Sequence, residues 1–321
     1  MNKHILSISK AILCVALLLG RNWVSAQSAI IDNGAITIKN GVLTIGSGDV
    51  IKGNGNVVTR EYEITGAFDE ITTLLPATIN YTVSDQYSCI VHVDENLLEY
   101  LDLHLNGDAL HLGVGGDKYN NVSLRPTVFV IDLAAPQLER IGIVGSGSFS
   151  FLDAIDGEEL EVNVIGCGDV VFEKEVNMAK MNLNLIGSGD ISFEETARID
   201  DLRLTLSGSG DLRCKQLISR KMRGAIAGSG DVRIADGDIE MMDAKVAGSG
   251  SFVSHADVDQ MDAQVSGSGE ITAKVNGELN YSITGSGGIN YYGDPSVKGV
   301  MLDREKLRKI DPSKAGKTKR K

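Results

Sequence analysis

The chain has 321 residues and a formal net charge of −12 at pH 7, with 31 basic against 43 acidic residues. Basic residues gather at its two ends, so the body between them is strongly acidic. An acidic body excludes general nucleic-acid binding, which needs a basic face that displaces counterions from phosphates.

The N-terminal segment has the order of features of a secretory signal. Lys3 and Lys10 precede or flank the apolar stretch 11–20, and a small-residue cleavage site ends at Ala26. About ten apolar residues are too few to cross a hydrocarbon core about 30 Å thick. We predict a signal peptide over 1–26, a mature chain without a transmembrane segment, and export to the periplasm, the outer-membrane surface or the extracellular space.

Cleavage would leave three cysteines, Cys89, Cys167 and Cys214. An odd number gives no disulfide framework, and the spacing is not that of a zinc site. Cys214 falls on an inward position of a repeat, and Cys167 replaces the serine of a Gly-Ser-Gly turn. We expect both to pack as small side chains, and we predict no cofactor.

Residues 27–59 are predicted as an irregular lead-in, and 60–140 as a β-rich region. Alternating apolar and polar runs mark strands at 90–93, 101–105 and 127–133. Asn106-Gly107 is a strong signal for a two-residue hairpin turn.

Pairing across that turn would set Leu103 opposite Leu110, and Asp102 opposite His111, with His104 diagonal to the second pair. The three polar side chains are interpreted as a surface cross-strand set, with a metal site as the alternative.

From residue 141 a Gly-x-Gly tripeptide returns at intervals that shorten from 21 to 18 residues. A fixed period near 20 with alternating strands predicts a solenoid, here a parallel β-helix over 141–293. The predicted fold class is all-β, with coils that turn at Gly-Ser-Gly and stack about 4.8 Å apart. The structural turn glycines are Gly145, Gly147, Gly166, Gly168, Gly187, Gly189, Gly208, Gly210, Gly228, Gly230, Gly248, Gly250, Gly267, Gly269, Gly285 and Gly287.

Both strands of each repeat alternate with a period of two, as half-buried strands do. Leucines and valines such as Leu204 are expected to point inward, and so are Tyr281 and Tyr291 at the C-terminal end. Their neighbours, Asn163 among them, are expected to face solvent. The apolar alternation ends by Tyr292, so we expect 294–321 to be a basic, apolar-poor tail that is disordered and buries little.

Two polar columns are candidate sites. Asp169, Asp190, Asp211 and Asp231 follow the glycine turn in four successive coils, where neighbouring carboxylates would repel each other. We expect each to accept a turn N–H, and the alternative is a row of calcium ions.

The second column is basic: Arg213 and Arg233 face outward, and Arg203 and Arg223 lie on the adjoining strand. These arginines are candidate ligand-binding residues for uronates or sulfated glycans. The alternative interpretation is a solvated face that neutralises nearby acids.

The segment 60–71 has the form RxYxxxGAFDEI, and GSGD and GSGS turns follow it. This combination, behind a secretory signal, resembles the putative auto-transporter adhesin head GIN domain family of gut Bacteroidetes and their relatives. The resemblance covers roughly 53–293. It implies a parallel β-helix shaped like pectin lyases without their catalytic residues, and a role in cell adhesion.

The combined prediction is an exported, non-catalytic, adhesion-like protein that presents a repeated surface to a host or polysaccharide ligand. Its partner would be a surface glycan or protein, not nucleic acid, and a homo-oligomer is left open. The alternatives are a glycan-active enzyme of pectin-lyase-like shape, which would need paired carboxylates in a groove, and a structural envelope protein.

Overall fold

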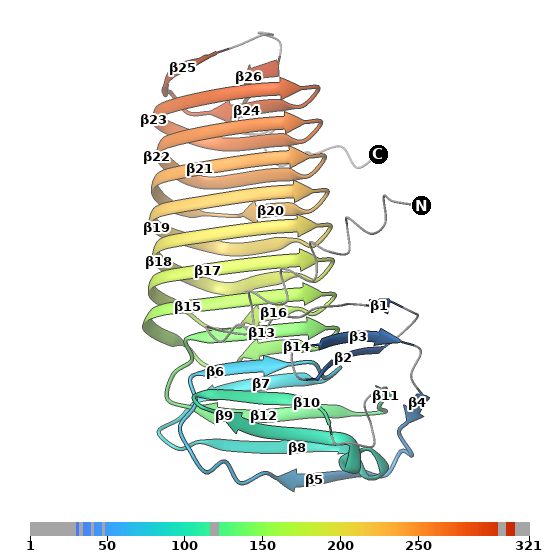
Figure 1. Cartoon of the computed structure of the whole chain (residues 1–321). Coiled ribbons are helices and arrows are strands. Elements are labelled where there is room, and N and C mark those ends of the chain that lie inside the picture. Colours follow the sequence, from blue (N-terminus) through green and yellow to red (C-terminus); the bar gives the residue numbers. More distant parts are fainter. Residues whose placement is uncertain are drawn as a thin grey trace.

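A computed structural model describes residues 30–31, 35–39, 42–46, 49–115, 122–300 and 306–311. The fold is all-β: a β-solenoid of about eight turns, with coils of about 20 residues, follows a less regular β region. Figure 1 shows the coils stacked in chain order above that region. The predicted signal peptide, with Cys14, and residues 312–321 of the basic tail lie outside the described residues.

The solenoid is built from strands that pair in parallel with the strand one coil later. Leu204 pairs with Gly224, and Gly208 with Gly228, so the glycine corners stay aligned from coil to coil. The strands are β13 (Arg140–Gly145), β14 (Ser148–Phe151), β15 (Ile155–Gly166), β16 (Val170–Phe172), β17 (Val176–Gly187), β18 (Ile191–Gly208), β19 (Leu212–Gly228), β20 (Asp231–Ile234), β21 (Gly237–Gly248), β22 (Ser251–Gly267), β23 (Glu270–Gly285), β24 (Gly288–Tyr292), β25 (Ser296–Val300) and β26 (Leu307–Lys309).

Within its described residues, the preceding region contains nine further strands and one 3-10 helix, besides a small separate sheet. That sheet has β1 (Ile30–Ile31), β2 (Ala35–Lys39) and β3 (Val42–Gly46). The others are β4 (Asp49–Lys52), β5 (Val57–Glu61), β6 (Glu70–Thr73), β7 (Thr78–Val83), β8 (Ser88–Asp94), η1 (Glu95–Tyr100), β9 (Leu101–Asn106), β10 (Ala109–Val114), β11 (Val122–Arg125) and β12 (Phe129–Ala135).

The two regions share one core because β6 and β7 act as the rung below the first coil. β13 pairs in parallel with β6, and β14 with β7. Tyr81 of β7 packs edge-on against Phe151, with ring centroids 5.5 Å apart. Phe151, Phe172 and Phe193 then stack on one another at 4.5 Å per step. The irregular region therefore supplies a packed base on which the repeats stand.

At the glycine corners, the backbone of one coil approaches the backbone of the previous coil too closely for a side chain to fit. Gly187 has a φ of 137°, and a Cβ there would overlap the carbonyl oxygen of Gly166. That same oxygen accepts a hydrogen bond from the N–H of Ser188 at 2.8 Å. The second glycine of the turn, Gly189, meets the carbonyl of Gly168 in the same way. Glycine is thus required by the hydrogen bond that joins one coil to the next.

The inward assignments are confirmed for most of the core, with exceptions at the end of the solenoid and on its outer face. Tyr281 and Tyr291 are only partly buried, whereas Tyr292 is buried, so the inward position in the last coil is one residue later than predicted. Asn163 was expected to face solvent but is buried, because it hydrogen-bonds Glu161 and Asn184 within a packed outer column.

The predicted hairpin exists, but its register is wrong. β9 and β10 pair with Asn106 opposite Ala109, which makes Gly107 and Asp108 the loop residues. Gly107 takes the positive φ, 69°, at the first loop position, where a side chain would be strained. His111 consequently lies opposite His104 instead of opposite Asp102.

Of the two cysteines that were expected to pack as small side chains, only one is buried. Cys214 is buried as expected, and burial raises the pKa of its thiol to about 12. Cys167 is exposed, because the middle residue of the glycine corner points outward.

The first part of the expected basic tail is ordered. β25 pairs with β23, and β26 pairs with β24, which adds a further partial coil. Leu307 of β26 packs against the core, and Ile310 donates its N–H to Tyr291 at 2.8 Å. The expectation that the tail buries little therefore needs correction at Leu307 and Ile310, which are half-buried, while Arg308 and Lys309 are exposed.

Replacing Gly187 by alanine should destabilise the protein by at least about 1–3 kcal/mol, the cost of strained backbone alone. The added Cβ would also push Gly166 away and break the coil-to-coil hydrogen bond. Urea unfolding measures the loss. Ser188→Ala at the same corner removes only an exposed hydroxyl and is the control; equal stability of the two variants would contradict the assignment.

Truncation after Leu302 should lower the melting temperature, because it removes β26 and uncovers the edge of β24. The half-buried Leu307 contributes on the order of 1 kcal/mol, besides its ladder hydrogen bonds. The control is a chain that ends at Asp311 and keeps β26. Identical melting temperatures for the two chains would mean that β26 does not protect the last coil.

Candidate functional site

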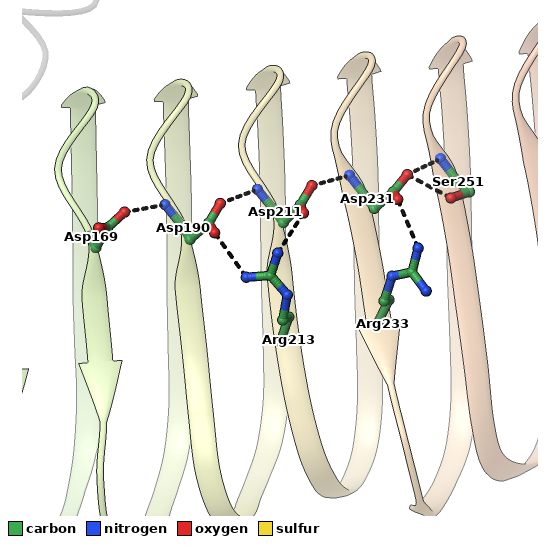
Figure 2. A network of polar contacts seen from close by, with 7 residues as sticks. All are labelled: Asp169, Asp190, Asp211, Arg213, Asp231, Arg233 and Ser251. Atoms are coloured by element: carbon green, nitrogen blue, oxygen red, sulfur yellow. Dashed lines mark hydrogen bonds and ion pairs between the residues drawn. The ribbon is translucent and has the colours of Figure 1, made fainter. Parts of the chain in front are cut away.

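The acidic column forms a continuous hydrogen-bonded ladder along the solenoid (Figure 2). Asp190 donates its N–H to the Oδ1 of Asp169 at 2.8 Å, and Asp211 donates to Asp190 at 3.0 Å. Asp231 continues the ladder by donating to Asp211 at 2.9 Å, and Ser251 ends it on Asp231 with both its N–H and its hydroxyl. Each carboxylate thus accepts a turn N–H from the next coil, and the three aspartates Asp190, Asp211 and Asp231 both donate and accept.

Arginines neutralise the second oxygens of this ladder. Arg213 bridges Asp190 and Asp211, each at 2.8 Å, and Arg233 binds Asp231 at 3.1 Å (Figure 2). The hydrogen bond to Asp190 is the main cause that raises the pKa of Arg213. Burial alone would raise the pKa of Asp231, but hydrogen bonds from Ser251 and Arg233 outweigh it and hold that pKa below the usual range.

The four candidate arginines do not share one surface. In the strand ladder, Arg213 lies opposite Arg233, and both follow a glycine corner. Arg203 lies opposite Arg223, and both precede a glycine corner. Arg223 donates to Asp201 at 2.7 Å, while Arg203 is exposed and has no described partner. Three of the four guanidiniums are therefore occupied within the protein, and Arg203 is the one available to a ligand.

The hairpin residues lie close together without enclosing a metal site. Asp102 and His104 are joined at 2.9 Å, and the rings of His104 and His111 stack 5.3 Å apart. Burial, followed by the neighbouring His104, lowers the pKa of His111. Within the described residues, no three His, Cys, Asp or Glu side chains converge as metal ligands, and this covers the acidic ladder too.

A surface hollow of about 210 Å³ was not predicted. It crosses four successive strands, β19, β21, β22 and β23, where each begins its run toward the glycine corner. Charged and amide side chains line it on the outer face, whereas its methionines are core residues except Met241, which is partly exposed. The lining residues are Lys221, Met222, Arg223, Met241, Met242, Asp243, Gln260, Met261, Asp262, Glu278 and Asn280.

A polar network on the irregular region was also missed. Thr59 and His92 lie 2.8 Å apart, His92 contacts Asp132 at 3.0 Å, and Asn80 donates to Asp132 at 2.8 Å. The four side chains come from four adjacent strands, β5, β8, β12 and β7. Since they are far apart in sequence, only the strand order could have predicted their contact.

Comparison with known proteins agrees with this architecture. The family model for the putative auto-transporter adhesin, head GIN domain, matches residues 67–255 and 181–295. No curated protein matches the chain.

Among the described residues, no helix is long and apolar enough to span a membrane.

Several solved structures are similar over most of the chain. A putative lipid binding protein from Parabacteroides distasonis is 28% identical, with a TM-score of 0.63, and the match covers 82% of this chain and all of that one. A putative adhesin from the same organism is 21% identical, with a TM-score of 0.64 and the same coverage. A putative adhesin from Parabacteroides merdae is 20% identical, with a TM-score of 0.59 and again the same coverage.

The hydrogen bonds to Asp231 predict a pH-dependent contribution to stability. Its pKa is lower in the folded chain than the value near 3.9 of an unfolded aspartate, so the contribution is present above about pH 4 and is lost as pH falls through the folded pKa. We expect Asp231→Asn to cost about 1–2 kcal/mol at pH 7 and progressively less below pH 4. Urea unfolding at several pH values measures this, with the exposed Asp238→Asn as control. A constant difference across the pH range would contradict the ladder.

The ladder should fold without calcium, because its Oδ1 atoms already accept backbone N–H groups. A chelator should leave the melting temperature unchanged. If the chelator lowered it by more than a few degrees and added calcium restored it, the calcium alternative would replace the hydrogen-bonded one.

Proposed function

This chain belongs to the family of the putative auto-transporter adhesin, head GIN domain, and from that membership we propose that it is an exported, non-catalytic binding protein. It would present the outer faces of its β-solenoid to a polysaccharide or protein ligand outside the cytoplasm. Two of the structurally similar proteins are described as putative adhesins, which supports a role of this kind.

The observation that carries this proposal is the rigid grid of polar side chains on the outer face. Strands fix the side chains in columns, with neighbours about 4.8 Å apart along the solenoid axis. Lys180 donates to Glu159 at 2.6 Å, and Asn184 donates to Asn163 at 2.9 Å, so the grid is held by its own contacts. Preorganised polar groups at a regular spacing suit a repetitive ligand, because little side-chain entropy is lost on binding.

Glycan cleavage is less well supported by the same surface. A glycosidase acid needs a raised pKa and a second carboxylate across a cleft. Burial and then Asp108 raise the pKa of Asp69, but neither residue lines the hollow. Glu278 does line it, and hydrogen bonds from Lys298 and then Asn280 lower its pKa, which keeps it ionised. Asp69, the acid with the raised pKa, therefore lies outside the hollow.

Lipid binding is a second candidate function. The Parabacteroides distasonis protein at 28% identity is described as a putative lipid binding protein. Met241, which lines the hollow and is partly exposed, favours this candidate here, because a thioether side chain adapts to apolar groups of varied shape.

The mature chain, 27–321, should bind a defined subset of a glycan and extracellular-matrix array, while the heat-unfolded chain should not. We expect Arg203→Gln to weaken recognition of anionic glycans about tenfold, because this guanidinium has no described partner. Arg213→Gln should weaken it less, since its donors are held by two aspartates. Absence of array binding by the folded chain would refute the proposal.

A further inference from the structure

Asp94, at the C-terminal end of β8, is a fully buried acidic residue. Its Oδ1 accepts the N–H of Gly55 at 2.7 Å and the hydroxyl of Thr127 at 2.6 Å, and its Oδ2 accepts the N–H of Thr127 at 2.7 Å. Burial alone would raise the pKa of Asp94, but hydrogen bonds, first of all from Thr127, outweigh burial and hold that pKa below the usual range. One buried carboxylate therefore joins three segments that are far apart in sequence.

The Gly-Asn-Gly-Asn segment 53–56 is shaped to fit this carboxylate. Gly53 lies so close to it that a Cβ at this position would overlap the Oδ2 of Asp94. Gly55 has a positive φ of 81°, a conformation that glycine adopts without strain, and it is this residue that donates its N–H to Oδ1. Both glycines are thus explained by the contact with Asp94.

The asparagines of the same segment bind the first residues of η1. Asn54 donates its N–H to the Oδ1 of Asn96 at 2.9 Å, and Asn96 in turn donates to the carbonyl of Lys52 at 2.9 Å. Asn56 donates to the carboxylate of Glu95 at 2.7 Å and accepts the N–H of Glu95 at 2.8 Å. The segment is therefore bound along its whole length to residues 94–96.

β5 follows directly from this segment and covers one edge of β8, at the base of the molecule (Figure 1). Among the described strands, β5 is in ladder register with β8 alone. Four of its five residues are exposed, and Val58 is only partly buried. Apart from the ladder, Thr59 contacts His92 at 2.8 Å. Since β5 buries so little apolar surface, polar contacts must hold it in place.

We propose that residues 53–61 form a strap that closes the base of the solenoid, and that Asp94 keeps this strap closed. An open strand edge presents unpaired N–H and C=O groups that pair with other chains, and solenoids protect their terminal rungs from this. The strap gives the edge of β8 that protection. When the contacts of Asp94 are lost, the strap opens while the coils stay folded, because none of its residues belongs to the apolar core.

Hydrogen exchange of the mature chain, followed by mass spectrometry, tests the strap. In Asp94→Asn the new NH₂ group must face the N–H of either Gly55 or Thr127, so a donor meets a donor. We expect amides of residues 53–61 to exchange at least about tenfold faster than in the native chain, and amides of β17–β22 to be unchanged. Asp238→Asn is the control, because it removes the same charge from an exposed position on β21.

A second variant leaves the carboxylate in place. Gly53→Ala pushes the segment away from Asp94 and should speed exchange of residues 53–61 in the same way. Its control is Gly113→Ala, whose Cβ would meet no atom closer than the carbonyl oxygen of Asp102 at 3.9 Å. The proposal is overturned if residues 53–61 of either variant exchange at the rate of its control. It is equally overturned if the β17–β22 amides exchange faster to the same degree, because Asp94 would then stabilise the whole fold and not a separate strap.

Discussion

The close approach of backbone to backbone at the glycine corner is the constraint on which the rest of the molecule depends. From Gly145 to Gly267, each corner carbonyl accepts an N–H from the next coil, and from the second corner on no Cβ fits at either glycine. This contact fixes the register of every coil relative to its neighbour. Because strand register decides which side chains face inward, the corner determines both the apolar columns inside and the polar columns outside.

Aligned columns create a physical problem, since they bring like groups together. Inside, the alignment is favourable: Phe151, Phe172 and Phe193 stack face to face. Outside, it would set carboxylate beside carboxylate, and the ladder resolves this by placing a backbone N–H between successive aspartates. The aspartates, whose like charges would otherwise repel each other, thereby form hydrogen bonds that join successive coils.

The sequence was sufficient for the features that repeat and insufficient for those that do not. The period of the glycine turns predicted the all-β solenoid and its inward leucines, because each repeat confirms the others. The hairpin register failed because Asn106-Gly107 and Gly107-Asp108 are both acceptable loops, and the longer pairing of β9 with β10 decided between them. β26 was missed because its short, charged sequence has no apolar alternation and pairs only because β24 offers it an edge. The hollow could not be predicted, since its lining residues come from four strands and depend on the conformations of many side chains.

Irregularity also explains where a specific ligand can be recognised. A surface that repeats in every coil offers the same contacts at every rung, so it cannot select one position along the axis. The hollow lies in the later, shorter coils, and the pairing of β22 with β23 shifts register between Val258 and Gln260 at its rim. A β-bulge of this kind reorients side chains and breaks a column. In these same coils Arg223 binds Asp201 and Asp243 binds Lys245, so the departure from the repeat gives this part of the solenoid a surface that the other described coils do not share.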